Sequence, residues 1–506
     1  MEAYFQYKSF KPSKNPSHKP ITEKDLENPN PQNVKIYLDF EENDLKNPKN
    51  WSVWYKTFVI GQLSFMTLSL TFASSVSSSS EQGMMEEFGC STITATASTG
   101  LFLVGMGLGA MPMAPLSELY GRLPIYLITM LLATLFEIGA ALAPNVPALL
   151  ILRLIAGFWS SAPLSNSGGT LNDIGDPVLR TIALPLFTTA GFAGPTLGPI
   201  IGGFVSNAEG YGWRWCYWIC AIWNGLAFLL SFFFMPETLA PALIKYKAVK
   251  YRLKTGENVW RAPIEDQDIH KLTVKYLQRP FVLLGKEPII QLFVLYLTVI
   301  YIVLYGYFTA YPIIFLQHGF TSSTVGLAFI PVMVGFMILM GFNVLHYLRY
   351  KKLTFDAKAG IERRGIHEGK VEPEERLVPL MACAILFPIG MFWLAWTSQP
   401  HFNVWIPLMS GLVFGIGLLA IFQGITQYLI DAYGPYAASA LAGSTLIRYS
   451  VAGLVSLAFP KAYETLGNQW ATSLFAFLGL ALTPAPFIFY VYGRRIRSRC
   501  TYTVRD

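Results

Sequence analysis

Long apolar segments separated by short polar ones run through most of this chain, and their lengths decide the class of fold. Each segment is close to the roughly 20 residues that a helix needs to cross the hydrocarbon core of a bilayer. Since backbone polar groups find no water at that depth, we expect each segment to be a transmembrane helix. Twelve spans are predicted, at residues 55–77, 94–115, 124–143, 147–168, 182–205, 214–235, 287–313, 323–344, 377–396, 404–430, 437–459 and 470–492.

The composition agrees with a membrane protein and excludes most other classes. Of the 506 residues, 53% are hydrophobic and only 14% are charged, and the mean hydropathy is +0.41. Soluble domains carry about 25% charged residues, so this chain has too few charges to cover a surface exposed to water. Its five cysteines are too few and too scattered for a disulfide framework. The sequence therefore predicts an all-α integral membrane protein.

The distribution of positive charge supports both the number of spans and their orientation. If the helices alternate in direction, 34 of the 38 Lys and Arg residues fall on one side of the membrane. The other side holds only Arg214 and Lys461, while Arg153 and Arg448 lie inside spans. This asymmetry is the positive-inside signal, so both termini are expected in the cytoplasm. Asn50, the only acceptor in an Asn-X-Ser/Thr sequon, should then escape glycosylation.

The polar segments divide the chain into five parts. The start of the chain is rich in proline and lacks the apolar core of a cleavable signal peptide, so we expect the first span to direct insertion. The long charged linker fits either short amphipathic helices on the inner membrane face or a solvated connection, and we expect the 345–376 loop to be only partly ordered. The parts are a disordered cytoplasmic tail (1–54), an N-terminal six-helix bundle (55–235), a cytoplasmic linker (236–286), a C-terminal six-helix bundle (287–493) and a cytoplasmic tail (494–506).

The sequence offers no recognisable catalytic or cofactor site. A nucleotide-driven pump needs a G-x-x-x-x-G-K-[ST] loop, and the nearest candidate, Gly285-Lys286, lacks the first glycine and the hydroxyl. None of the six histidines stands at metal-ligand spacing from another His or Cys. Cys216 and Cys220 share one helix face and are typical of small core residues. We therefore expect no enzyme activity and no bound metal or cofactor.

Three ionisable residues are predicted at membrane depth: Glu137 in the third span, Arg153 in the fourth and Arg448 in the eleventh. Charged groups are costly to place there, which makes them functional candidates. Glu137 and Arg153 each lie six residues from the same membrane face, about 9 Å deep at 1.5 Å per residue. They are therefore able to pair, either as a proton-coupling site or as a structural ion pair between two helices.

Several short motifs follow one another on successive spans. Before the third span the chain reads APLSELYGRLPIY, the fourth carries RLIAGFWSSAPLSNSGG and NDIGD, the fifth GFAGPTLGPIIGG, and the tenth runs into QYLIDAYGPYAASALAG. This ordered set resembles the major facilitator superfamily, in particular its fungal twelve-span drug:H+ antiporter branch. The resemblance implies twelve helices in two pseudo-symmetric six-helix halves around a central cavity. It also implies a monomer in the lipid bilayer, by default the plasma membrane, that moves a small molecule and protons and binds no nucleic acid.

The resemblance implies an inner gate at the loop between spans two and three. The family pattern G-x-L-x-D-R-x-G-R places Glu118 at the acidic position and Gly121 and Arg122 at its end, although alanine and leucine replace the first glycine and first arginine. In the family arrangement Glu118 lies near the start of the eleventh helix and Arg122 pairs with Asp173. This arrangement is physically reasonable, because an acid is stabilised at a helix N-terminus and an arginine forms paired hydrogen bonds with a carboxylate. The alternative to an inner gate is that Glu118 and Arg122 are solvated loop charges. Gly121 is expected to have a positive φ.

Two further motifs connect the resemblance to proton-coupled export. Arg153 opens an R-x-x-x-G motif, in which the family's arginine is implicated in proton transfer. The fifth span matches the family's antiporter motif, whose glycines let helices approach closely and whose prolines bend the helix; packing alone is the alternative reading. The motif residues are Gly191, Gly194, Pro195, Gly198 and Gly202.

The resemblance assigns the cavity lining to spans one, four, seven and ten. Tyr301, Tyr305 and Phe308 form an aromatic stripe on one face of span seven. Such stripes more often face lipid or the core, but neighbouring amide side chains are typical of an apolar pocket with a few polar groups. The predicted ligand is bulky, partly aromatic and amphipathic, and the lack of acidic residues argues against a highly charged polyamine. The other predicted substrate-binding residues are Phe65, Asn166, Phe422, Gln423 and Gln427.

Together these observations predict a secondary transporter that exports such a molecule by alternating access in exchange for protons. Glu137 is the only carboxylate predicted at membrane depth, so it is the candidate proton carrier, with its proton affinity set by Arg153. The alternative is a structural Glu137–Arg153 pair and a proton site elsewhere. An importer of a specific nutrient or polyamine is the second function considered, and a non-transporting membrane sensor is the third.

Overall fold

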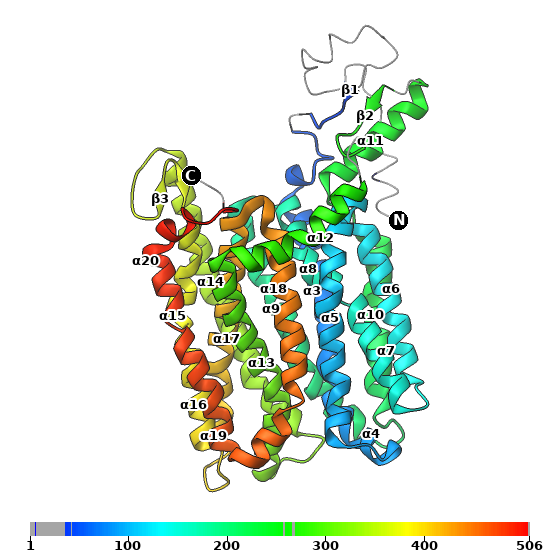
Figure 1. Cartoon of the computed structure of the whole chain (residues 1–506), viewed down its shortest axis with the longest axis vertical. Helices are drawn as coiled ribbons and strands as arrows, with labels where there is room; N and C mark the ends of the chain where they lie inside the picture. The colour runs from blue at the N-terminus through cyan, green and yellow to red at the C-terminus, as the bar shows by residue number, and fades with distance from the viewer. Residues whose placement is uncertain (1–5, 7–35, 42, 257–258, 266–268, 504–506) are drawn as a thin grey trace.

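The computed structural model describes residues 6, 36–41, 43–256, 259–265 and 269–503. The long helices lie side by side in one bundle, and α11 (Ala240–Thr255) and α12 (Ile269–Lys286) lie at one end of it (Figure 1). We call this end the linker end, because both helices belong to the predicted linker. Most of the predicted N-terminal tail falls outside the described residues.

Four helices in the first half of the bundle begin at polar capping residues. Ser52, Ser91, Asn145 and Asp176 each accept the N–H of the residue three positions on, which satisfies one of the free donors of a first turn. The helices of this half are α3 (Val53–Ser75), η3 (Val76–Ser80), α4 (Glu81–Phe88), α5 (Thr92–Tyr120), α6 (Arg122–Ala141), α7 (Val146–Trp159), α8 (Ala162–Ile174), α9 (Pro177–Ser206) and α10 (Arg214–Phe234).

The second half contains more interrupted helices. Gly467 has a non-helical φ of 72° inside α19 and separates its first turns from the long segment that follows. The helices of this half are α13 (Pro288–Gln317), η4 (Val325–Phe329), α14 (Ile330–Lys358), η5 (Pro373–Leu377), α15 (Val378–Cys383), α16 (Leu386–Thr397), α17 (Trp405–Tyr433), η6 (Gly434–Tyr436), α18 (Ala437–Ser456), α19 (Phe459–Leu482) and α20 (Ala485–Arg497). A short 3-10 turn, η2 (Pro48–Asn50), precedes α3.

By length and hydropathy, 11 helices within the described ranges are able to cross a membrane. Among the long helices of the bundle, α9 falls outside that set, because many of its 30 residues are glycine, proline and threonine, which lower its hydropathy. It lies within the same bundle and packs along α3 and α14. The architecture is therefore the all-α membrane fold that the sequence predicts, and it is consistent with twelve spanning helices.

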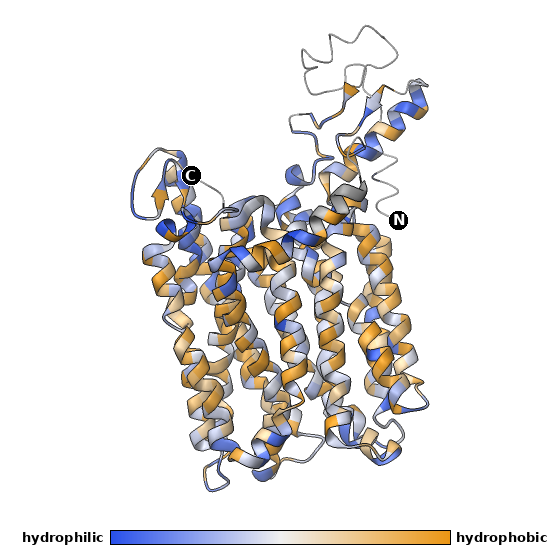
Figure 2. Ribbon diagram, in the orientation of Figure 1, coloured by the Kyte–Doolittle hydropathy of each residue, from blue (hydrophilic) through white to orange (hydrophobic). Residues whose placement is uncertain are grey.

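Hydrophobic residues predominate along the helices of the bundle, and hydrophilic residues gather toward its two ends (Figure 2). On α10, for example, Ile222, Leu226 and Leu229 are about half exposed. Apolar patches of this extent are unusual on soluble monomers and match the hydrocarbon layer of a bilayer.

The two halves pack through small residues. A Cβ on Gly100 of α5 would lie 2.6 Å from the carbonyl oxygen of Gly453 on α18, and one on Gly107 would lie 2.6 Å from Ser450 Oγ. The backbones of α5 and α18 are therefore in direct contact. On the other side of the bundle, α9 packs against α14.

The expectation of a partly ordered 345–376 loop is wrong. Helix α14 does not stop at residue 344 but continues to Lys358, and its buried Leu353 and Ala357 pack against Ile366. The strands β3 (Ile366–His367) and β4 (Lys370–Val371) then pair antiparallel before η5 begins. The charged side chains that signalled a loop lie on a helix that has left the apolar layer.

The disorder expected for the whole N-terminal tail is also corrected for its described end. Strand β1 (Ile36–Tyr37) pairs in parallel with β2 (Trp260–Arg261) of the linker, and Leu38 is buried against α11. The linker thus contains two helices, of which α12 lies across the bundle end and α11 stands away from it with this strand pair (Figure 1).

Candidate functional site

Arg153 and Glu137 form an ion pair inside the first half of the bundle. Arg153 Nη1 lies 2.8 Å from Glu137 Oε1, and neither side chain is exposed. Arg153 also donates to the Ala73 carbonyl at 2.9 Å and to Ser77 Oγ at 3.1 Å, and its guanidinium lies over the Phe102 ring. Glu137 Oε2 has no hydrogen-bond partner in the described chain. The pair is therefore fully removed from solvent, and only one of the two carboxylate oxygens is matched within the described residues.

Arg122 holds together the linker end of the first half. Its Nε donates to Asp173 at 3.1 Å and its Nη1 to Ser117 Oγ at 2.6 Å. Glu118 lines a cavity of about 660 Å³ at this end, which also reaches Ala437 at the start of α18. The structure thus brings Glu118, Arg122 and Asp173 to one place, in the arrangement that the resemblance implied.

Glu237 belongs to the same contact and was missed by the sequence analysis. Its carboxylate accepts the N–H of Arg122 at 3.0 Å and of Leu123 at 3.1 Å, and so caps the start of α6. Gly121 has a φ of 107°, as expected, and a Cβ there would lie 2.5 Å from Glu237 Oε2. Burial raises the pKa of the Glu237 carboxyl, and the hydrogen bonds that it accepts from backbone N–H groups partly offset this rise in pKa. The available signal was the MPET segment that follows the sixth span.

Arg376 makes the corresponding contact in the second half and also bridges the two halves. Its Nε donates to Asp431 at 2.6 Å, and its Nη2 donates to the Pro177 carbonyl at 2.9 Å. Its Nη1 donates to Thr181 Oγ1 at 2.5 Å and to Gln427 at 3.3 Å. Pro177 and Thr181 begin α9, so Arg376 ties η5 to the opposite half. The sequence analysis missed both Arg376 and Asp431.

A small central cavity lies between the halves. Tyr301 and Phe422, both predicted to bind substrate, line it together with Thr426 and Arg448. Its volume is about 30 Å³, whereas sites for small molecules usually enclose about 300–1,000 Å³. The described conformation is therefore closed around the centre of the protein.

The other predicted substrate-binding residues do not line this central cavity. Gln423 accepts a hydrogen bond from Asn343 at 2.7 Å and donates to the Pro185 carbonyl at 3.2 Å. Asn166 donates to the Met113 carbonyl at 3.3 Å. Their amides therefore hold helices together, because polar groups at this depth bind whatever partner is near. The predicted residues placed elsewhere are Phe65, Asn166, Tyr305, Phe308, Gln423 and Gln427.

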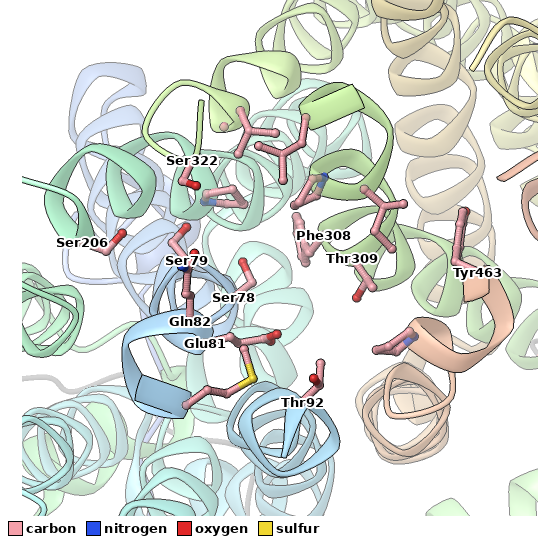
Figure 3. Close-up of a pocket in the computed structure, with 18 of the residues that line it drawn as sticks. Ser78, Ser79, Glu81, Gln82, Thr92, Ser206, Phe308, Thr309, Ser322 and Tyr463 are labelled. Carbon is pink, nitrogen blue, oxygen red and sulfur yellow. The ribbon is translucent and has the colours of Figure 1, made fainter. Parts of the chain in front are cut away.

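A larger cavity of about 960 Å³ lies between the halves at the opposite end of the bundle. Phe308 and Tyr463 line it from the second half, facing Ser78 and Glu81 of the first (Figure 3). Thr96 Oγ1 donates to the Glu81 carboxylate at 3.1 Å. Glu81 was not singled out from the sequence, although it ends the serine run after the first span.

The glycines of the predicted antiporter motif form the face of α9 that packs on α3. A Cβ on Gly194 would collide with Thr71 and lie 2.7 Å from the Leu68 carbonyl oxygen, and one on Gly198 would collide with Ser75. Close packing is thus the direct consequence of the glycine spacing, and α3 is the partner helix.

No group of three or more His, Cys, Asp or Glu side chains is arranged to hold a metal ion within the described residues. Cys216 and Cys220 are fully buried and form no disulfide. The site thus consists of one fully buried ion pair inside the first half, two arginine–aspartate pairs at the linker end, one of which also joins the halves, and three cavities along the bundle.

Comparisons with known proteins point to one family. Residues 63–457 match the family model described as Major Facilitator Superfamily. The uncharacterized transporter C530.02 of Schizosaccharomyces pombe is 41% identical over 460 residues, which cover 90% of this chain and 83% of that protein. The MFS-type transporter kojT of Aspergillus flavus is 38% identical, with 90% and 80% covered. The efflux pump FUBT of Fusarium oxysporum is 36% identical, with 92% and 77% covered.

A solved structure shows the same fold. The proton:xylose symporter XylE matches with a TM-score of 0.62 at 16% identity, covering 87% of this chain and 96% of XylE. These relatives and this structural neighbour are transporters rather than enzymes. Since the family model spans most of the chain, this protein belongs to the Major Facilitator Superfamily of membrane transporters.

Proposed function

We propose that this transporter exports a bulky amphipathic small molecule in exchange for protons. The observation that carries the proposal is the fully buried Arg153–Glu137 pair, because a carboxylate at membrane depth is able to carry a proton across the protein. The relative named as an efflux pump and the antiporter-like glycine face of α9 favour export.

The cavities support alternating access between the two halves. In the described conformation Arg376 joins η5 to α9 at the linker end, and the larger of the two end cavities lies at the opposite end. Transport would require these contacts to break, so that the central cavity opens toward the linker end. The proposed moving units are the bundles 55–235 and 287–493.

Protonation of Glu137 would change a buried contact that is connected to the packing between the two halves. A neutral Glu137 no longer balances the charge of Arg153, which then depends on the Ala73 and Ser77 acceptors near the end of α3. Because α3 packs along α9, a change in this contact reaches the helix that Arg376 holds. The alternative is that the pair only joins α6 to α7.

We also propose that the linker end faces the cytoplasm and that the protein resides in the plasma membrane. The linker, the α14 end and the α20 end carry most of the described Lys and Arg residues, whereas Arg214 and Lys461 lie at the opposite end. This distribution supports the orientation through the positive-inside rule.

Sealed inside-out vesicles that contain the full-length protein test the export proposal. The probes are three aromatic acids and their amides: benzoate and benzamide, 2-naphthoate and 2-naphthamide, and indole-3-acetate and indole-3-acetamide. An acidic lumen should drive at least one probe inward, and a protonophore should abolish the uptake. Passive weak-acid trapping works in the opposite direction, and vesicles without the protein give the baseline. Movement only out of the vesicles would indicate import, and probe movement that ignores the proton gradient would refute proton coupling.

A further inference from the structure

Arg448 of α18 lines the central cavity without an acidic partner. Its side chain is 3% exposed, and its Nε has no hydrogen-bond partner within the described residues. Its nearest aromatic neighbours are the rings of Tyr301 and Phe422, whose centroids lie 4.9 and 5.1 Å from the guanidinium carbon. The lining of the cavity includes no Asp or Glu.

Other buried arginines of the protein are matched by a carboxylate. Arg122 pairs with Asp173, Arg153 with Glu137 and Arg376 with Asp431. Arg448 is comparably buried and forms no ion pair in the described part of the chain. Burying an unmatched ion costs more free energy than contacts with aromatic faces return. The cavity therefore favours a negatively charged group beside Arg448.

Thr426 supplies an independent sign that the cavity is built for a polar ligand. Its hydroxyl is buried and also has no partner in the described chain, and it lines the same cavity as Arg448. A guanidinium and a hydroxyl are the donors that hold an organic anion, and the rings of Phe192, Tyr301 and Phe422 offer apolar walls.

We propose that the cargo is an aromatic or similarly planar organic acid, whose anionic group binds Arg448 with Thr426 as a second donor. This inference rests on the proposed function, because it names the substrate class of that transporter. It also goes beyond the amphipathic character of the cargo, since a neutral molecule of the same shape would leave Arg448 unmatched.

Equilibrium binding of the same three acid–amide pairs to the full-length protein in lipid nanodiscs tests the proposal. The wild type should bind the acids at least about tenfold more tightly than the amides, which is the scale of one charge-assisted hydrogen bond. Arg448→Gln should remove this preference and leave amide binding unchanged, whereas Arg448→Lys should retain part of it. Thr426→Val should weaken acid binding by a smaller factor. Lys461→Gln removes an exposed positive charge and should behave as the wild type.

Three results would overturn the proposal: no acid preference in the wild type, unchanged acid binding in Arg448→Gln, or equal loss of acids and amides, which would make Arg448 structural. Arg448→Lys and Thr426→Val guard against a variant that fails to fold. Gradient-driven movement of amides without acid preference would refute this inference and leave export standing. Acid-selective binding without gradient-driven movement would support this inference and refute the proposed proton-coupled export.

Discussion

Arg376 and Asp431, which lie 2.6 Å apart at the linker end, repeat in the second half the contact that Arg122 and Asp173 make in the first. Each arginine precedes the third span of its half, and each aspartate lies at the end of the fourth. The second pair also reaches the other half, Arg376 through Pro177 and Thr181 of α9 and Asp431 through an ion pair with Arg180 of the same helix. The two pairs are thus alike in position but differ in what they hold together.

Replacing Arg376 should loosen the linker end. Arg376→Gln removes charge-assisted hydrogen bonds to the start of α9, so amide hydrogen exchange over residues 177–189 should become at least about tenfold faster. Arg363→Gln breaks a more exposed pair with Asp356 within one half and is the matched control. Unchanged exchange in Arg376→Gln would show that other contacts close this end.

The Arg122–Asp173 contact should depend on opposite charge rather than on residue identity. Arg122→Asp and Asp173→Arg should each impair transport, and the double exchange should recover part of it because the ion pair is restored. Flux of the best-transported probe in vesicles measures both effects. If the double variant is no better than the single ones, the direct pair does not carry the function.

Glu137→Gln should lose most of its proton-driven export while its probe binding stays intact. Glutamine keeps a hydrogen-bond acceptor for Arg153 but does not titrate. Flux measured across a range of pH should therefore lose its dependence on the gradient, and Glu464→Gln, which alters an exposed ion pair, serves as control. If the pair is structural instead, removing the carboxylate should cost about 3–5 kcal/mol of stability and lower the melting temperature. A stable variant with normal pH-dependent export would exclude Glu137 as the carrier.

The glycine face of α9 should not tolerate a methyl group. Gly194→Ala places a Cβ against Thr71 and the Leu68 carbonyl, so we expect a loss of about 1–3 kcal/mol from overpacking. Gly61→Ala, where nothing lies within 4 Å, should be neutral or slightly stabilising. A thiol-reactive dye that reports exposure of the buried Cys216 and Cys220 measures thermal unfolding. Equal melting temperatures for both variants would contradict tight packing of α9 on α3.

The orientation can be tested at Asn50. Expression in a eukaryotic host should give no glycan, because the proposed orientation keeps this sequon in the cytoplasm. The readout is gel mobility with and without a glycosidase. A shift that disappears in Asn50→Gln would reverse the orientation of every helix.

The helices and one buried pair were accessible from the sequence, whereas most partners were not. Most spans were predicted to within several residues at each end. The main exceptions are α14, which continues to Lys358 beyond the predicted end, and the twelfth span, where α19 begins at Phe459 and a separate helix, α20, begins at Ala485. Glu137 and Arg153 were placed at one depth because they are 16 residues apart on adjacent antiparallel helices. Gln423 and Gln427 join other residues in the described conformation, because an amide on a cavity helix is equally able to pair with a neighbouring element.

What the sequence determined by itself is the membrane class, the number of spans and the alternation of charge, because each depends on matching local composition to a bilayer or to water. The tertiary structure decided which polar groups meet. Arg376 and Thr181 are 195 residues apart in the chain, and Arg448 is left unmatched because no carboxylate of the described residues lines its cavity. Such contacts depend on how the two halves pack, and a local sequence pattern does not predict that packing.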